Sequence, residues 1–384
     1  MKKILYVSGS RAEYGIMKRL LLELSKEQNI ELKIIVTGMH CDPKYGMTYK
    51  YIYDDGFDVI ERIDINLKND NNFSVVKSMS LCQNSIAKHF ETHKYDAVIV
   101  LGDRYEIFAA SVAAAMNNIP IIHLHGGEQT LGNYDEFIRH AITKMSRLHL
   151  VSTEIYRKRV IQLGEHPETV FNIGALGAEN SLSINLPNKD SLQQKFGNLI
   201  KPYFMVVFHP ETITNNSPSE QTKELLSALE FIKDRFDFIF IGANSDTGSG
   251  SITNLVIEFC NRYGFRFITS VQSEDYLALS KYSVGLIGNS SSGLIEIPSF
   301  RIPTINIGDR QKGRVRGKSV IDVICKRENI LEAIIYSQSD TFKKMLEDSV
   351  NPYYKKSSLT SARDIILDFI HSKHPVAKSF YDLE

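Results

Sequence analysis

Short apolar runs alternate with longer amphipathic segments through the first half of this chain. Apolar runs of strand length occupy residues 4–8, 31–38, 58–65, 97–102, 119–125, 148–153 and 170–174. Helical periodicity falls between several of them, at residues 16–26, 73–93 and 105–117 and in a segment that ends near Leu163. Strands that alternate with helices indicate a parallel sheet with right-handed crossovers. The first half therefore predicts an α/β fold with a doubly wound parallel sheet.

The second half restarts the same alternation after a polar stretch. Its apolar runs cover residues 203–209, 237–244, 265–270, 283–289 and 302–308, with helical segments at 220–235, 252–263, 274–281 and from about Ser292. Residues 180–201 are polar and show no clear strand, so we place a domain boundary here. We expect an N-terminal domain at 1–180, a C-terminal domain at 181–360, and an amphipathic C-terminal segment at 361–384 that packs back onto the first domain.

Length and charge narrow the functional classes. A chain of 384 residues exceeds one compact core, because domains average about 150 residues. Lys plus Arg and Asp plus Glu both number 45, so net charge gives no reason to expect nucleic acid or a membrane as a partner. No apolar run approaches the ~20 residues of a membrane span. The four cysteines are scattered without a C-x-x-C pair, which fits a reducing cytosol, so we expect a cytoplasmic protein.

Charged side chains follow two neighbouring predicted strands in the first half. Asp103 and Arg104 come directly after the strand AVIVLG, and Glu128 comes just after the strand IPIIHLH. Ligands of open α/β sheets bind outside the carboxyl ends of the strands. We therefore expect Asp103 and Glu128 to face one cleft, with Asp135 as a third carboxylate close by and Arg139 in the same segment.

The run HLHGGE also has a metal interpretation. His123 and His125 stand two residues apart, so they share a strand face and are possible metal ligands. The remaining ligands would have to be the same carboxylates that the cleft requires. We therefore expect no metal at this site.

Two segments offer ligands for an anion. GSRAEYG places Arg11 in a glycine-bearing turn between a strand and a helix, although a plain turn with a surface Arg explains it as well. It matches neither G-x-G-x-x-G nor a P-loop. GNSSSGLIE places Ser290 and Ser291 at a helix start, where they cap the helix or bind a diphosphate. Glu296, expected in the first turns of that helix, is a candidate acceptor for ribose hydroxyls.

Further polar residues follow strands of the second half. Arg310 begins a basic loop, GDRQKGRVRGK, and lies nearest the strand end, whereas Arg316 and Lys318 fit a solvated face. His209 follows another strand and is either structural or a donor to a diphosphate. Asn244, in a glycine-rich strand exit, contacts a nucleotide or makes the turn. Acids on one half and anion ligands on the other predict an enzyme that acts on a nucleotide-sugar.

Eight motifs in order carry a resemblance to a known family. They are GSRAEYG, TGMHCD, LGDRYE, HGGE, DEFIRHAITK, FHPET, GNSSSGLIE and INIGDRQKGR. This combination resembles the hydrolysing UDP-N-acetylglucosamine (UDP-GlcNAc) 2-epimerases of bacterial sialic-acid synthesis. The resemblance implies two Rossmann-like domains of the glycosyltransferase-B type with an interdomain cleft, a homodimer, and no required cofactor. It also implies the reaction of UDP-GlcNAc with water to give N-acetylmannosamine and UDP, by elimination of UDP to 2-acetamidoglucal and then hydration.

The resemblance also implies roles for individual residues. Asp103, Glu128 and Asp135 fall on the catalytic carboxylates with Arg139 beside them, although Glu136 is an alternative to Asp135. The implied UDP ligands are His209, Ser290, Ser291, Glu296 and Arg310, with Arg11, Arg104 and Asn244 as further contacts. Four alternatives stay open: a non-hydrolysing epimerase that releases UDP-N-acetylmannosamine, a hydrolysing epimerase for a UDP-diacetamido sugar, a retaining glycosyltransferase, and a non-catalytic nucleotide-sugar sensor.

Overall fold

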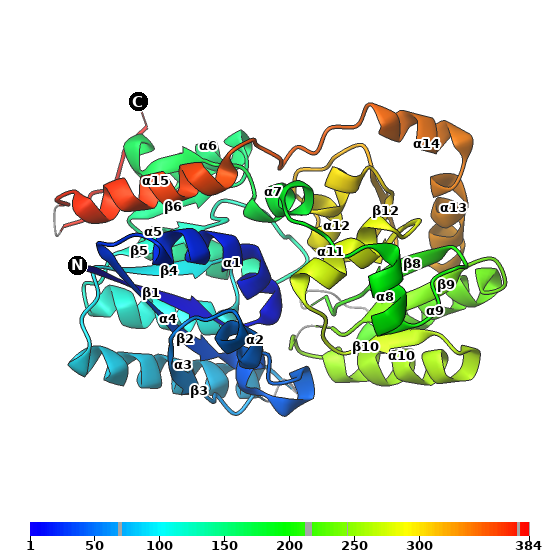
Figure 1. Ribbon diagram of the computed structural model, residues 1–384, viewed down its shortest axis with the longest axis horizontal. Helices are drawn as coiled ribbons and strands as arrows, with labels where there is room; N and C mark the ends of the chain where they lie inside the picture. The colour runs from blue at the N-terminus through cyan, green and yellow to red at the C-terminus, as the bar shows by residue number, and fades with distance from the viewer. Residues whose placement is uncertain (68–70, 212–216, 244, 375–376, 384) are drawn as a thin grey trace.

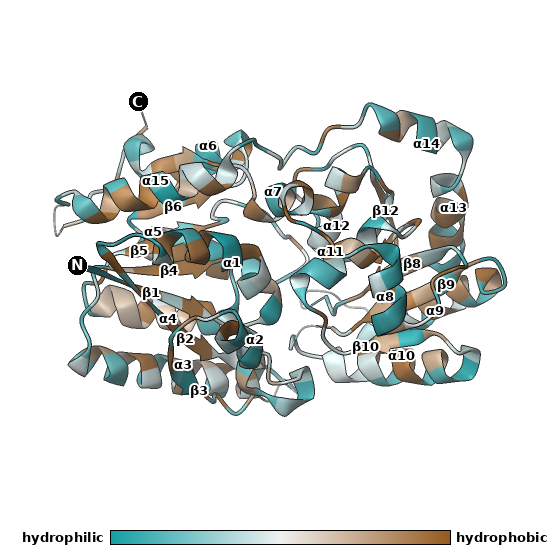
Figure 2. Ribbon diagram, viewed as in Figure 1, coloured by the Kyte–Doolittle hydropathy of each residue, from teal (hydrophilic) through white to brown (hydrophobic). Residues whose placement is uncertain are grey.

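The computed structural model describes residues 1–67, 71–211, 217–243, 245–374 and 377–383. Within these ranges, two parallel sheets stand side by side, each covered by helices on its two faces (Figure 1). Hydropathy follows the same layering, because the strands are largely apolar while the outer helices carry polar residues on their exposed faces (Figure 2). Strands that are covered on both faces read as continuous apolar runs, which is why the sequence revealed most of them.

The first sheet has seven strands in the order β3-β2-β1-β4-β5-β6-β7, and all neighbours pair in parallel. Its strands are β1 (Lys2–Ser8), β2 (Ile30–Thr37), β3 (Val59–Ile63), β4 (Ala97–Leu101), β5 (Ile121–Leu124), β6 (Leu148–Val151) and β7 (Val170–Asn172). Its helices are α1 (Arg11–Ser25), α2 (Tyr49–Asp54), α3 (Asn72–Thr92), α4 (Tyr105–Met116), α5 (Asp135–Met145) and α6 (Glu154–Gln162). β4 and β5 are central, so the turns after them meet at one sheet edge.

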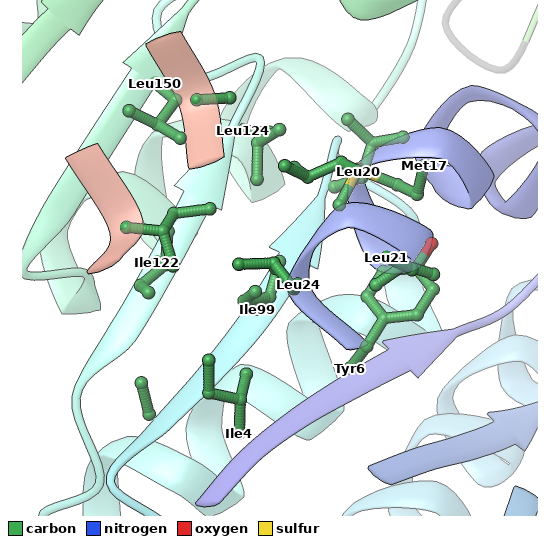
Figure 3. Packing of buried hydrophobic residues seen from close by; sticks show 14 of the residues in the cluster. Ile4, Tyr6, Met17, Leu20, Leu21, Leu24, Ile99, Ile122, Leu124 and Leu150 are labelled. Atoms are coloured by element: carbon green, nitrogen blue, oxygen red, sulfur yellow. The ribbon is translucent and has the colours of Figure 1, made fainter. Parts of the chain in front are cut away.

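Helix α1 shows how the sequence builds this half. Ser10 caps its N-terminus by accepting from the backbone N–H of Glu13, and Leu20, Leu21 and Leu24 recur on one face. Figure 3 shows these leucines packed toward the strands that carry Ile4, Ile99 and Ile122. Fully burying a side chain of this size contributes about 1.5–3 kcal/mol. The leucine face therefore fixes α1 on the sheet, and with it the loop that holds Arg11.

The second sheet has six strands in the order β10-β9-β8-β11-β12-β13, again all parallel. Its strands are β8 (Tyr203–Val207), β9 (Asp237–Ile241), β10 (Arg266–Ile268), β11 (Gly285–Gly288), β12 (Thr304–Ile307) and β13 (Val320–Val323). Its helices are α8 (Lys189–Phe196), α9 (Pro218–Ile232), α10 (Ser249–Tyr263), α11 (Ser273–Lys281), α12 (Ser292–Ile295), α13 (Arg327–Ser337) and α14 (Asp340–Glu347). Short 3₁₀ turns are η1 (Gly38–Cys41), η2 (Pro43–Tyr45), η3 (Pro167–Thr169) and η4 (Ile297–Phe300).

Several elements were absent from the sequence predictions. Helix α8 lies inside the polar stretch 180–201, where Leu192 is its one buried side chain, so its apolar face is too narrow to read. Strand β13 is an edge strand that keeps its residues partly exposed, and it lacks the apolar run of a central strand. Helices α2, α13 and α14 were likewise not predicted.

The chain returns to the first half at its end. Helix α15 (Ser358–His371) packs on α1, and it adds Leu359, Ile366 and Phe369 to the core that contains Ile4 (Figure 1). Helix α7 (Leu176–Ser183) lies between the halves, since it contacts both α1 and η4. The division of the chain near residue 180 stays a prediction. In the described ranges, no helix has both the length and the apolar character to cross a membrane.

Candidate active site

A cavity opens between the two halves at the carboxyl ends of β4, β5, β8 and β11. Most of the residues predicted from the sequence line it: Arg11, Asp103, Arg104, Glu128, Asp135, His209, Ser290, Ser291, Glu296 and Arg310. Arg139 is fully buried behind the cavity wall, and Asn244 lies outside the described residues. Strand tips from both sheets therefore converge on one space, as expected for ligand sites of open α/β sheets.

Tight backbone turns aim the acids of the first half at this cavity. After β5 the chain adopts left-handed conformations at His125, with φ of 64°, and at Gly127, with φ of 76°. A Cβ atom at Gly127 would lie 2.6 Å from the carbonyl oxygen of Tyr156, so only glycine fits there. The side chain of Glu128, which follows this double turn, lines the cavity.

Arg139 ties the predicted acids together from behind. Its guanidinium donates to Asp103 from Nε (2.7 Å) and Nη2, and to the carbonyl oxygen of Glu128 from Nη1 (2.8 Å). Nη1 also donates to Glu136 (2.9 Å), and Nη2 to Thr130 (2.7 Å). A fully buried Arg with all these partners fixes the geometry of the wall that carries the acids.

Glu128 is almost fully buried among positive and hydrogen-bonding groups. Its Oε2 lies 2.9 Å from Nη2 of Arg314, and its Oε1 lies 3.0 Å from Nδ1 of His125. Ser152 donates to the same Oε1 at 2.9 Å. Burial raises the pKa of Glu128, but the charges of Arg314, His125 and Arg139 outweigh it and hold the pKa well below its usual range. Glu128 is therefore ionised at neutral pH.

Asp135 has the opposite environment. Burial, together with the negative charges of Asp103 and Asp246, raises its pKa well above the usual range. Its Oδ2 accepts a hydrogen bond from Asn133 at 2.8 Å. These surroundings therefore favour the protonated form of Asp135, even though the N-terminus of α5 favours the anion.

The neighbouring acid, Glu136, is not among the residues that line the cavity. It accepts from the backbone N–H of Thr130 at 2.6 Å and from Arg139 at 2.9 Å. Burial raises its pKa, but hydrogen bonds from His140 and Thr130 and the charge of Arg139 lower it to about 2. Of the two acids that the sequence left open, Asp135 is the one that lines the cavity.

The wall of the second half offers hydroxyl and backbone N–H groups. Asn289 joins two strand tips, because its amide accepts from the backbone N–H of His209 at 2.7 Å and donates to the carbonyl oxygen of His209 at 2.9 Å. Ser290 and Ser291 follow directly, before the four-residue helix α12.

The prediction that Glu296 lies in the first turns of a helix was wrong. α12 ends before Glu296, which is its C-cap, and the chain continues into η4 because Pro298 follows. Burial raises the pKa of Glu296 to about 7.

Among the described residues, four arginines border the space between the walls: Arg314, which pairs with Glu128, and Arg11, Arg104 and Arg310. Arg11 crosses from the first half and donates to the carbonyl oxygen of Val271. Arg104 also crosses, donating to Ser245 at 2.6 Å while Glu106 neutralises it from behind at 2.6 Å. Arg310 is held by Asp246 at 3.3 Å, and its buried Nε has no hydrogen-bond partner in the described part of the chain. This Nε is thus a ready donor for an anionic ligand.

Comparison with known proteins agrees with this arrangement. The profile of the UDP-N-acetylglucosamine 2-epimerase family matches residues 22–367. This chain belongs to that family. The epimerase is 58% identical to the polysialic acid biosynthesis protein P7 of Escherichia coli over 383 residues, covering 100% of this chain and 98% of the relative. It is 41% identical to the GDP/UDP-N,N'-diacetylbacillosamine 2-epimerase (hydrolyzing) of Campylobacter jejuni, over 84% of each chain.

Solved structures share the fold of this epimerase. The UDP-GlcNAc 2-epimerase of Neisseria meningitidis bound to UDP-GlcNAc superposes with a TM-score of 0.77 at 21% identity, covering 95% of this chain and 100% of that one. The Methanocaldococcus jannaschii UDP-GlcNAc 2-epimerase, in complex with UDP-GlcNAc and UDP, gives a TM-score of 0.79 at 18% identity, covering 95% and 99%. The predicted fold, two Rossmann-like domains of the glycosyltransferase-B type, is confirmed.

The sequence missed two residues at the centre of the epimerase site. From the sequence, His125 was considered together with His123 as a possible metal pair. His123 donates from Nε2 to the carbonyl oxygen of Gly102 (2.8 Å), whereas His125 lines the cavity. Because Gly102 offers only an acceptor, Nε2 of His123 carries the proton. Arg314 was one of several basic residues in a loop, and no local pattern marked it. In the described ranges, no group of three or more His, Cys, Asp or Glu side chains is arranged to hold a metal ion.

Proposed function

We propose that this epimerase is a hydrolysing enzyme that converts UDP-GlcNAc and water to N-acetylmannosamine and UDP, as the first step of sialic-acid synthesis for a surface polysaccharide. The observation that carries the proposal is a pair of carboxyl groups in one cavity whose surroundings shift their pKa values in opposite directions, down for Glu128 and up for Asp135. An inversion at C2 needs a base and an acid on opposite faces of the sugar, and enzymes obtain them by driving two pKa values apart.

The first chemical step is elimination of UDP. The C1–O bond breaks and its electron pair leaves with the diphosphate, while Glu128 takes the C2 proton and the C2–H electrons form the C1–C2 double bond of 2-acetamidoglucal. Loss of the leaving group is assisted by donors aimed at the developing negative charge. The donors proposed for that role are the available Nε of Arg310 and the hydroxyl and backbone N–H groups of Ser290 and Ser291.

The second step is hydration from the opposite face. Asp135 gives its proton to C2, and the oxygen of a water molecule bonds to C1. The water proton returns to Asp135, and the proton held by Glu128 passes to solvent, so that both groups regain their starting state. Asp103, fixed by Arg139, keeps the charge of Asp135 suppressed.

Product analysis tests the proposal directly. Purified protein mixed with UDP-GlcNAc should release free UDP and N-acetylmannosamine, and in heavy water the product should carry deuterium at C2. Release of UDP-N-acetylmannosamine instead would identify a non-hydrolysing epimerase, transfer to an acceptor sugar without deuterium at C2 would identify a glycosyltransferase, and intact UDP-GlcNAc would indicate a sensor.

A UDP-diacetamido sugar is the second candidate substrate. Relatives named for UDP-N,N'-diacetylbacillosamine are 41% and 36% identical to this chain. The 58% identity to a polysialic acid biosynthesis protein favours UDP-GlcNAc. The kcat/KM values for the two UDP-sugars decide between them.

We further propose that the enzyme acts in the cytoplasm and that it is a homodimer. Light scattering of the purified protein tests the oligomeric state.

A further inference from the structure

The loop at residues 309–316 of the second half is inserted into the first half. The carbonyl oxygen of Lys312 accepts from the backbone N–H of Leu131 at 3.0 Å. A Cβ atom added at Gly132 would lie 2.6 Å from the carbonyl oxygen of Asp309, and one added at Gly313 would lie 2.6 Å from the side chain of Gln129. The two loops thus fit together at backbone contact distance, which side chains at these glycines would prevent.

A pair of buried tyrosines grips this loop at Val315. Tyr156, from α6, accepts the backbone N–H of Val315 at its hydroxyl oxygen (2.9 Å). Tyr353, from the segment before α15, donates its hydroxyl to the carbonyl oxygen of Val315 (3.0 Å), and the two hydroxyl oxygens lie 2.9 Å apart. Both side chains are fully buried. The two backbone groups of one loop residue are therefore held by hydroxyls, one of them on a helix of the opposite half.

The residue next to this grip is Arg314, which crosses the cavity to Glu128. Its Nη2 lies 2.9 Å from Oε2 of Glu128, although its backbone belongs to the second half. Its buried Nε and Nη1 have no hydrogen-bond partner within the ranges that the structure describes. The groups that surround Glu128 are the cations Arg314 and Arg139, the imidazole of His125, the hydroxyls of Ser152, Tyr156 and Tyr353, and the acid Glu296.

We propose that Arg314 is a positioning residue that keeps Glu128 ionised only while the loop 309–316 is docked. Glu128 is therefore able to act as the base only when the two halves are in contact. A carboxylate buried this deeply takes up a proton unless a cation offsets its desolvation. Arg139 and His125 belong to the same half as Glu128, whereas Arg314 reaches it from a loop of the other half. This inference rests on the proposed function of Glu128 as the base.

The pH dependence of kcat tests whether Arg314 keeps Glu128 ionised. Removing an opposite charge at this distance raises a carboxyl pKa by about 1–3 units. As the pH falls from the raised pKa of Glu128 in Arg314→Met toward its wild-type pKa, the ratio of wild-type to variant kcat should therefore grow by about tenfold per pH unit. Arg314→Lys, which keeps the charge, should restore a profile close to wild type. Lys312→Met is the matched control, because its side chain is exposed on the same loop. A ratio that is constant with pH would overturn the proposal.

Hydrogen exchange tests the docking of the loop without any turnover. Tyr156→Phe removes the acceptor of the Val315 N–H, so peptides that contain residues 309–316 should exchange about 5- to 10-fold faster, and kcat should fall as it does in Arg314→Met. Unchanged exchange and unchanged kcat would overturn the proposal that Tyr156 holds the loop in its docked position. If the wild-type enzyme converts no UDP-sugar, the proposed function fails, and the exchange experiment alone decides whether the loop is held as inferred.

Discussion

Two buried carboxyl groups line one cavity of this epimerase, and their surroundings differ in almost every respect. Glu128 is surrounded by Arg314, His125 and Ser152, which all favour its anion. Asp135 faces Asp103 and Asp246, which both disfavour a further negative charge. Burial acts on the two groups in the same direction, toward protonation. The comparison shows that the neighbours, and not the depth of burial, decide the direction in which each pKa is shifted.

Removing either member of the pair should have the largest effect. Glu128→Gln cannot accept the C2 proton and Asp135→Asn cannot donate one, so each should lower kcat by on the order of 10²–10⁴. Affinity for UDP, measured by calorimetry, should stay near wild type because the groups proposed to assist loss of the diphosphate, those of Ser290, Ser291 and Arg310, are on the other wall. Glu258→Gln, at an exposed glutamate of α10, should change neither quantity. Loss of UDP affinity equal to the loss of turnover would contradict the assignment.

The next largest effect concerns the residue that holds the acids in place. Arg139 is fully buried and paired with Asp103, so Arg139→Met leaves a partly buried carboxylate without its cation. Breaking a buried pair in this way destabilises a protein by about 3–5 kcal/mol. Arg262→Gln, which breaks an exposed pair on α10, should change the stability by less than about 1 kcal/mol. Denaturant unfolding of the two variants measures the difference. Equal midpoints would show that the ion pair of Arg139 with Asp103 does not stabilise the fold.

A smaller effect is expected at the diphosphate wall. Arg310→Ala removes a buried charge whose Nε is available to a ligand, and a hydrogen bond to a charged group contributes about 1.5–3 kcal/mol. Affinity for UDP should fall about 10- to 100-fold, and affinity for UMP, which lacks the second phosphate, should fall less. Calorimetric titration with both nucleotides checks this. An equal loss for both would place Arg310 away from the diphosphate.

The sequence predicted one side of the comparison better than the other. Asp103 and Glu128 could be found because a charge follows an apolar run, and chain order makes β4 and β5 neighbours. The partner that keeps Glu128 ionised could not be found. Arg314 is placed by Tyr156 and Tyr353, which lie 158 and 39 residues away along the chain, and no local pattern encodes a contact of that separation.

The same limit explains the errors on the second wall. The serines of GNSSSGLIE were located correctly because they follow a buried strand, but the helix after them was expected to include Glu296. Pro298 has no backbone N–H and cannot continue the hydrogen-bond ladder, so the chain turns into η4. A proline of this kind shortens the helix without changing the strand pattern that reveals the site, and Glu296 still lines the cavity.

The smallest expected effect separates the two neighbours of Asp135. Burial and Asp103 raise its pKa more than Asp246 does, so Asp246→Asn should lower the pKa of Asp135 by about one unit or less. The change also frees Arg310 from its ion pair with Asp246, and this cation acts on Asp135 in the same direction. In the proposed mechanism Asp135 acts in its protonated form, so activity is present below its pKa and is lost as pH rises through that pKa. The basic limb of the kcat profile should therefore move to lower pH in Asp246→Asn, and it should not move in Asp309→Asn, whose side chain is exposed. A basic limb that stays in place in the first variant would mean that another group, and not Asp135, supplies the proton to C2.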